Sequence, residues 1–199
     1  MPFIRESIVT TLNADGSAHL APLGVIEEPP FLVLAPFHPS TTLANLRRHP
    51  FACVNYVTDV RLFAGCVSRV RRDWPVVAAE RIEGWRAAAA LAHSELEVVE
   101  TVEDAQRPRW RCREVHAATH APFLGFNRAQ SAVLEAAILV SRLGMLPAAK
   151  IESELRYLAI GLAKTAGAAE REAWGWLMER VRAAGYAVPE DCGHPLSTG

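Results

Sequence analysis

The stretch SIVTTLNADGSAHLAPLGVI, residues 7–26, carries the pattern that decides the fold. Two runs rich in apolar and β-branched residues, 7–12 and 17–26, flank the turn sequence NADG at 13–16. Asn, Asp and Gly favour tight turns, because they tolerate backbone conformations that other residues avoid. The stretch therefore predicts a β-hairpin.

Four further runs extend the sheet to six strands. They have the character of extended chain and are bounded by turn residues, and they cover residues 31–35, 51–57, 95–102 and 108–115. A short polar helix containing residues 43–48 is expected between the first two of them. Strands this short, with connections this tight, favour a small barrel or a strongly curved sheet.

One helix is expected inside the strand region. Asp73-Trp74-Pro75 has the form of a helix start, with a capping residue before a proline. Apolar residues then follow at helical spacing as far as Ala89. The pattern predicts one helix inserted among the six strands.

The composition changes to that of helices after about residue 118. Apolar stripes at helical spacing predict three helices, at residues 129–143, 151–162 and 174–181. The expected organisation is a barrel domain at 1–118, a helical domain at 119–187 and a flexible tail at 188–199.

The composition also narrows the class of protein. Half of the 199 residues are apolar, and 21 basic side chains nearly balance 22 acidic ones, so the chain can bury a core. No apolar run reaches the roughly 20 residues of a membrane span, and neither half carries the positive field of a nucleic-acid binder. With no signal-peptide core and four cysteines lacking a C-x-x-C pair, we expect a cytoplasmic protein with free thiols and no nucleic-acid or membrane partner.

The loop after the third strand holds the most informative motif. Three consecutive hydroxyls, Ser40, Thr41 and Thr42, stand where a helix should begin. These hydroxyls and the free N–H groups of the helix start would converge on one point, which suits a phosphate. Helix capping is the alternative, although one cap explains only one hydroxyl.

Two other stretches could face a ligand. In the second strand, Pro22 cannot donate to a ladder and Gly24 lacks a side chain, so a flat ligand could lie against the backbone there. An edge strand with a bulge is the alternative. The fourth strand ends in polar residues, from Asn55 to Asp59, with Phe63 shortly after. Such residues usually form turns, but they could equally hold a sugar alcohol.

The order and spacing of these motifs resemble those of the FMN-binding split-barrel superfamily, which includes flavin-reductase-like and pyridoxamine-phosphate-oxidase-like proteins. The matching motifs are the D-G hairpin, A-P-x-G-V, F-x-x-S-T-T-x-x-N-L and V-N-Y-x-T-D. The chain is most similar to a domain-of-unknown-function family with a C-terminal helical domain. The signature of that domain, F-N-R-A-x-x-A-V-x-E-A, begins here at Phe126.

The resemblance implies an α+β fold, in which a six-stranded antiparallel split β-barrel of the FMN-binding type precedes a small C-terminal helical domain. It also implies a homodimer, with FMN in a groove at the dimer interface. Many split-barrel oxidases have a basic residue in the phosphate loop where this chain has Thr42. Arg47, Arg48 or Arg128 would then have to neutralise the phosphate.

The resemblance further assigns residues to each part of FMN. Three would hold the phosphate with a fourth nearby, three would line the ring through their backbone, and others would face the ribityl chain, stack on the ring or close the site. They are Ser40, Thr41, Thr42 and Asn45 for the phosphate, with Phe37 at the start of the same motif; Leu23, Gly24 and Val25 for the ring; Asn55, Thr58 and Asp59 for the ribityl chain or ring edge; Phe63 on the ring; and Asn127 and Arg128 closing the site.

The expected function is that of an FMN-dependent oxidoreductase with an unknown substrate. No side chain is an evident acid, base or nucleophile, which suits hydride transfer at a flavin ring. The same lack suits a non-catalytic flavin-binding or accessory protein, which the resemblance links to methanopterin-dependent one-carbon metabolism. A deazaflavin in place of FMN is a further alternative, because the superfamily uses both.

A rival signal for a metal site is weaker. Cys112, His116 and His120 are spaced by four, as zinc ligands on one face of a helix would be. The sequence around them alternates like a strand, which would separate these side chains, and His93 shows no ligand spacing. No metal site is therefore expected.

A rival signal for nucleic-acid binding is the row of arginines at 109, 111 and 113, which would lie on one strand face. No aromatic platform accompanies the row, and several acidic residues in the preceding strand could neutralise it. A solvated or salt-bridged face is the favoured interpretation.

Overall fold

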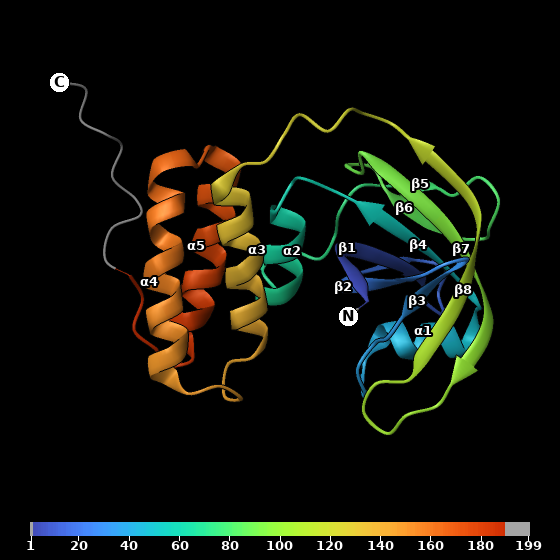
Figure 1. The fold of residues 1–199 in the computed structure, drawn as a ribbon, viewed down its shortest axis with the longest axis horizontal. Coiled ribbons are helices and arrows are strands. Elements are labelled where there is room, and N and C mark those ends of the chain that lie inside the picture. The colour runs from blue at the N-terminus through green and yellow to red at the C-terminus, as the bar shows by residue number, and fades with distance from the viewer. Residues whose placement is uncertain (1, 190–199) are drawn as a thin grey trace. The chain divides into compact units, whose positions relative to one another are not determined.

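The predicted hairpin is present as strands β1 (Phe3–Leu12) and β2 (Ala18–Glu28) in the computed structural model, which describes residues 2–189 (Figure 1). Between the two strands, Gly16 adopts a positive φ of 84°, and its N–H donates to the Asn13 carbonyl at 3.0 Å. The Asp15 carboxylate accepts the N–H of Ser17 at 3.0 Å. The hairpin therefore follows from turn chemistry that is local in the sequence.

Six antiparallel strands close into a barrel in the order β1-β2-β3-β8-β7-β4. The predicted six-stranded antiparallel barrel followed by helices is thus confirmed, and the fold is α+β. The four strands beyond the first hairpin are β3 (Phe31–Leu34), β4 (Phe51–Tyr56), β7 (Ala92–Val102) and β8 (Arg109–Thr119).

Alternate residues of the strands fill the barrel, because successive side chains of a strand point to opposite faces. Every barrel strand contributes to one core cluster, including Val9, Val25 and Leu34. Helix α1 (Thr41–Arg48), between β3 and β4, adds Leu43 and Leu46 to the same cluster. The barrel core therefore fixes the position of α1 against β1 and β2.

The segment from Asp73 to Ala89, expected to be a helix, forms a two-stranded sheet instead. Strand β5 (Val76–Ala78) pairs with β6 (Trp85–Ala87). Glu95 of β7 holds the loop between them, because its carboxylate accepts the N–H groups of three successive loop residues at 2.6 to 3.0 Å. N–H groups held in this way are not available to the hydrogen-bond ladder of a helix.

A helix that the sequence analysis does not predict, α2 (Arg61–Ser68), follows β4. Leu62 and Phe63 are among its buried residues, and the helix ends at Arg69, which adopts a positive φ of 67°. The helix packs with α3 (Arg128–Ser141) and α5 (Ala168–Ala183).

The three predicted C-terminal helices are confirmed as α3, α4 (Ala148–Thr165) and α5. Their core is formed by fully buried aliphatic side chains, as the apolar stripes predict. The buried set includes Val133, Ile151, Leu155, Leu162, Leu177 and Val181.

The described chain forms two compact units. The barrel unit runs up to Thr58 and continues over Asp73–Phe123, whereas the helical unit comprises Asp59–Arg72 and the chain from Leu124 onward. This division differs from the expected single boundary at residue 118, because the α2 segment interrupts the barrel sequence but packs with the later helices. The expected tail at 188–199 lies almost wholly outside the described residues.

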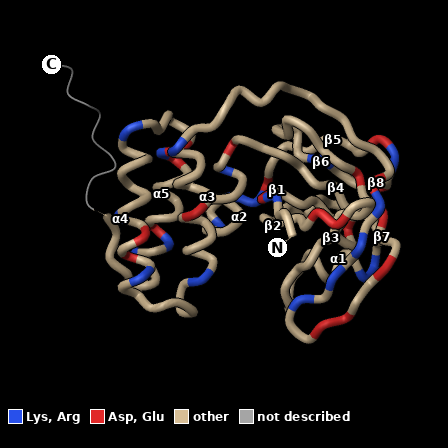
Figure 2. Tube along the Cα trace, in the orientation of Figure 1, with Lys and Arg blue, Asp and Glu red and all other residues tan. Residues whose placement is uncertain are grey.

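The row of arginines on β8 forms ion pairs with acidic residues of neighbouring strands, and Figure 2 shows acidic and basic segments close together near β7 and β8. Arg111 pairs with Glu100 at 2.8 Å, and Arg113 pairs with Glu97. Arg109 pairs with Glu28 of β2. The prediction of a salt-bridged face is confirmed. No helix among the described residues has the length and apolarity needed to cross a membrane.

Candidate functional site

The loop between β3 and α1 ends in a helix start with free polar groups. Ser40 is the N-cap of α1, and its hydroxyl accepts the N–H of Leu43 at 3.3 Å. Capping therefore accounts for one of the three hydroxyls. Thr41 is exposed and Thr42 is buried, and the backbone N–H groups of the first helical turn have no partner within the helix. This end of α1 carries partial positive charge and suits an anion.

The turn between β7 and β8 braces this loop from outside. The N–H of His38 donates to the carbonyl of Gln106 at 2.9 Å, and Arg107 Nε donates to the carbonyl of Ala35 at 2.7 Å. The guanidinium of Arg107 also lies 4.7 Å from the centre of the exposed Phe37 ring, within cation–π distance. Arg107 is thus a fourth cation to consider beside the phosphate loop, and the sequence analysis does not identify it.

Asp104 shapes the bracing turn. Its carboxylate accepts the N–H groups of Arg107 and Gln106 at 2.7 and 2.9 Å. These backbone hydrogen bonds hold the pKa of Asp104 below its ordinary value of 3.8. An Asp two and three residues before such donors is a recognisable turn signal, so this residue could have been found from the sequence.

Two of the three arginines expected to neutralise a phosphate already have partners. Arg47 pairs with Glu103 at 3.1 Å, and Arg48 donates to the carbonyl of Leu12 and to the Asn45 side chain. Both are exposed, so these pairs are individually weak and can be exchanged for a bound anion.

Asn45, expected near the phosphate, joins α1 to the first hairpin. Its buried amide nitrogen donates to Thr11 Oγ1 at 3.1 Å and to Asn13 Oδ1 at 3.0 Å. It therefore connects α1 to β1 and to the turn that follows β1.

The β2 segment expected to line a flavin ring has a backbone edge that β3 does not pair. β2 pairs with β1 along its length, but with β3 only from Ile26 to Glu28. The edge at residues 22–25 therefore lies beside the point where β3 ends and the 35–40 loop begins. Leu23 and Gly24 are partly exposed there, while Val25 points into the core.

Asn55 and Thr58 were expected to face a ribityl chain or ring edge. The amide of Asn55 is fully buried, donates to the Ile8 carbonyl at 2.9 Å and to Thr10 Oγ1 at 2.6 Å, and accepts the N–H of Ala87 at 2.7 Å. Both ends of this amide hold the barrel wall together, so the geometry does not support a ribityl contact by Asn55. Thr58 is partly buried at the end of β4 and makes no such contacts among the described residues.

The other four expected residues belong to the helical unit, and three have roles within it. Asp59 makes a bidentate ion pair with Arg61, which raises the pKa of the Arg61 guanidinium. Phe63 is buried. Asn127 caps α3 by accepting the N–H of Ala129 at 2.8 Å.

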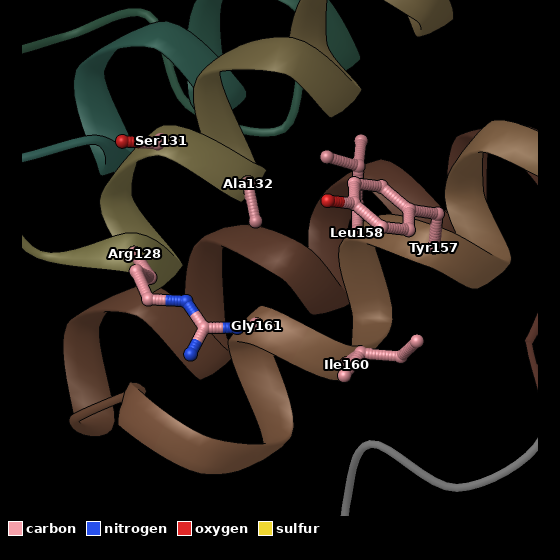
Figure 3. Close-up of a pocket in the computed structure, with 7 residues that line it drawn as sticks. All are labelled: Arg128, Ser131, Ala132, Tyr157, Leu158, Ile160 and Gly161. Atoms are coloured by element: carbon pink, nitrogen blue, oxygen red, sulfur yellow. The ribbon is translucent and has the colours of Figure 1, made fainter.

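Arg128 is the member of this group whose charge is free. Its guanidinium makes no hydrogen bond or ion pair with the described residues. The side chain lines a surface pocket of about 220 Å³ between α3 and α4, where Gly161 and Leu158 also lie (Figure 3).

The barrel site offers binding groups but no evident catalytic nucleophile. Burial raises the pKa of the Cys53 and Cys112 thiols to about 12, so both are protonated at neutral pH. The remaining groups are hydroxyls, backbone N–H groups and arginines. Such a set can bind a phosphorylated ligand and orient a flat ring.

The closed six-stranded antiparallel barrel, with a hydroxyl-rich loop leading into α1 and three helices after it, defines an α+β barrel protein. Within this class, the chain belongs to the family of proteins of unknown function DUF447. The N-terminal domain of that family matches residues 5–121, and its C-terminal domain matches residues 127–179.

Several solved structures share the fold. The FMN-bound DUF447 protein MM1853 from Methanosarcina mazei has a TM-score of 0.77 and 20% identity, over 90% of this chain and 96% of that one. The 2-nitrobenzoate 2-nitroreductase NbaA from Pseudomonas fluorescens has a TM-score of 0.51 and 22% identity, over 60% of this chain and 66% of that one. Flavoredoxin from Methanosarcina acetivorans has a TM-score of 0.51 and 20% identity, over 63% of this chain and 72% of that one. No curated protein matches the chain in sequence.

Proposed function

We propose that this protein binds FMN in its barrel unit and acts as an FMN-dependent oxidoreductase. One observation carries the proposal: the anion-binding start of α1 and the unpaired edge of β2 lie on either side of the end of β3. A phosphate and a flat ring joined by a short chain need two such elements near each other. The relative MM1853 is described as FMN-bound, which agrees with this assignment.

Each of these elements has a distinct role in the proposed complex. The N–H groups and hydroxyls of Thr41 and Thr42 bind the phosphate, and Arg107 with Arg47 or Arg48 balances its charge. The backbone of Leu23 and Gly24 contacts the ring. When bound, FMN supplies the hydride-transfer chemistry, which explains why the site needs no acid, base or nucleophile of its own.

The binding step is tested by FMN titration of the flavin-free full-length protein, followed by fluorescence. Thr41→Ala and Thr42→Val each remove a hydroxyl, and hydrogen bonds to a charged group contribute about 1.5 to 3 kcal/mol. We expect about a 10- to 100-fold weaker affinity for each variant. Thr101→Ala, an exposed threonine on β7, is the matched control and should bind as the parent does. Unchanged affinity in both loop variants would reduce these hydroxyls to structural groups.

Turnover is tested separately. Anaerobic addition of NADH or NADPH to the FMN complex should bleach the flavin absorbance if the protein is an oxidoreductase. A stable spectrum would instead favour a non-catalytic flavin-binding protein. A parallel titration with a deazaflavin decides between the two ring systems. We expect the protein to bind FMN more tightly than the deazaflavin.

The proposal includes assembly as a homodimer. The exposed large apolar side chains of the barrel unit include Phe3, Ile4 and Phe37, with 49 to 61% of their surface accessible. A second copy of the chain would cover such groups. Light scattering of the FMN complex should give twice the mass of one chain, and a monomer at micromolar concentration would contradict this part of the proposal.

A further inference from the structure

Four titratable side chains gather on one face of the β7–β8 pair. His93 and Glu95 are two residues apart on β7 and therefore point to the same face. His116 of β8 is directly opposite Glu95 in the ladder, and His120 follows the end of β8. Leu96, the residue after Glu95 on β7, belongs to the barrel core cluster. The four titratable side chains therefore lie on the face of β7 and β8 that points away from the barrel core.

The group lies at the opposite end of β7 and β8 from the turn that braces the 35–40 loop. That turn joins the last residue of β7, Val102, to the first of β8, Arg109. His93 is near the beginning of β7, and strands rise about 3.3 Å per residue. The cluster is therefore distinct from the proposed phosphate site.

Three backbone hydrogen bonds hold the carboxylate of Glu95. The N–H groups of Glu80, Arg81 and Ile82 donate to its two oxygens at 2.6, 2.7 and 3.0 Å. The Glu95 and His93 side chains are completely buried. A buried carboxylate held by several N–H groups remains ionised, so negative charge is built into this place.

His93 is oriented through both ring nitrogens. Its Nε2 lies 3.1 Å from Glu95 Oε1, and its Nδ1 lies 2.9 Å from His120 Nε2. A ligating histidine commonly has its second nitrogen hydrogen-bonded to a neighbouring acceptor, which fixes the ring and its tautomer. His120 can supply that acceptor for His93.

His116 supplies a ring nitrogen that no described residue hydrogen-bonds. Its Nε2 is buried and has no hydrogen-bond partner among the described residues. The Glu80 carboxylate is 3.4 Å away, but its direction does not make a hydrogen bond. A buried unpaired polar atom is costly, and a bound ion is one explanation for it.

We propose that His93, Glu95 and His116 bind a divalent transition-metal ion of the Zn²⁺ class. One ligand atom from each of the three lies within 4.8 Å of the others. Two imidazoles and one carboxylate are a common ligand set for Zn²⁺, with bonds of about 2.0 to 2.2 Å. The 3.1 Å between His93 Nε2 and Glu95 Oε1 already matches two ligands of one ion. His116, whose side chain is 23% exposed, supplies the third ligand atom from the outer side of the cluster.

The fourth position of the ion is open to water or to the Glu80 carboxylate. Glu80 is exposed and lies beside His116, so its side chain can approach the ion without disturbing the core. Arg86 of β6 is the opposing positive charge near His120. The two negative charges of Glu95 and Glu80 together exceed the single positive charge of Arg86.

The test is calorimetric titration of chelator-treated full-length protein with Zn²⁺. The parent should bind one ion per chain at this site, and excess Mg²⁺ should not displace it, because Mg²⁺ prefers oxygen ligands. His116→Ala should weaken Zn²⁺ binding by at least about 10- to 100-fold, which is the loss typical of removing a group that merely supports a metal ligand. The control is His49→Gln, which removes a histidine outside the cluster and should bind Zn²⁺ as the parent does.

His116 is chosen because it is partly exposed, so its removal leaves the buried pair of His93 and Glu95 in place. Thermal unfolding of the metal-free variant checks that it is folded, and Zn²⁺ should raise the Tm of the parent more than that of the variant. Binding by the Thr41→Ala variant should equal that of the parent, which separates this proposal from the FMN site. Failure of the parent to bind Zn²⁺, or equal binding by the His116→Ala variant, would overturn the proposal.

Discussion

At Gly24, the side chain of Ile4 on β1 packs closely against the backbone of β2. A Cβ atom at this position would lie 2.8 Å from Ile4 Cγ2, which is closer than carbon atoms can approach. Gly24→Ala must therefore displace Ile4 or the strand, and overpacking of this kind costs about 1 to 3 kcal/mol. We expect the free energy of unfolding in urea to fall by that amount.

The same contact provides the control for this prediction. Ile4 is about half exposed, so Ile4→Ala alone should change stability little. In the double variant the clash is absent, and most of the lost stability should return. A double variant as unstable as Gly24→Ala would place the strain elsewhere in β2.

The turn between β7 and β8 braces the 35–40 loop, and the ionised Asp104 carboxylate orders this turn. The N–H groups of Arg107 and Gln106 lower the pKa of this carboxylate, so the folded state binds its proton less readily than the unfolded chain. The stabilisation is therefore present above the ordinary value of 3.8 and is lost as the pH falls through the lower folded value. The backbone amide resonances of Gln106 and Arg107 should titrate with a midpoint below pH 3.8.

Asp104→Asn is the matched variant, since it keeps the shape and removes the charge. Its amide resonances at Gln106 and Arg107 should not titrate in this range. We also expect FMN affinity to fall several-fold, because Arg107 would lose its fixed position next to Ala35 and Phe37. A titration midpoint at or above pH 3.8 for the same resonances in the parent would contradict the prediction.

The elements that local chemistry determines could be predicted from the sequence, and those that distant partners determine could not. The β1–β2 hairpin depends on a turn of adjacent residues, and the Ser40 cap on a helix start next to it. The β5–β6 hairpin depends on Glu95, which is far along the chain from the loop that it holds. Helical spacing within 73–89 therefore led to the wrong element.

The same distinction applies to the sites. The phosphate loop is contiguous, so its hydroxyls stand out in the sequence. The histidine cluster requires the register of β7 against β8, which brings His116 opposite Glu95. From the sequence alone, only the spacing of two between His93 and Glu95 on one strand indicates that these two side chains share a face. The burial of Asn55 could not be predicted, because a polar residue at a strand end gives no indication of how deeply it is buried.

At the scale of the whole molecule, the chain leaves the barrel unit, contributes α2 to the helical unit and returns. The apolar residues of α2, including Leu62 and Phe63, are buried in the complete chain. The helix packs with α3 and α5, which follow much later in the sequence. The barrel unit therefore cannot be cut from the chain by a single boundary without uncovering α2.

A fragment of residues 1–123 tests this dependence. It retains α2 but lacks α3 and α5, so the buried face of α2 is exposed to solvent. Because short isolated helices are marginal in water, we expect limited proteolysis to cut within 59–72 while the full chain resists cleavage there. A second fragment, in which 59–72 is replaced by a Gly/Ser linker of equal length, should aggregate less and keep a cooperative barrel transition. Resistance of the first fragment within 59–72 would mean that α2 is held by the barrel sequence, and that the two family domains fold independently of each other.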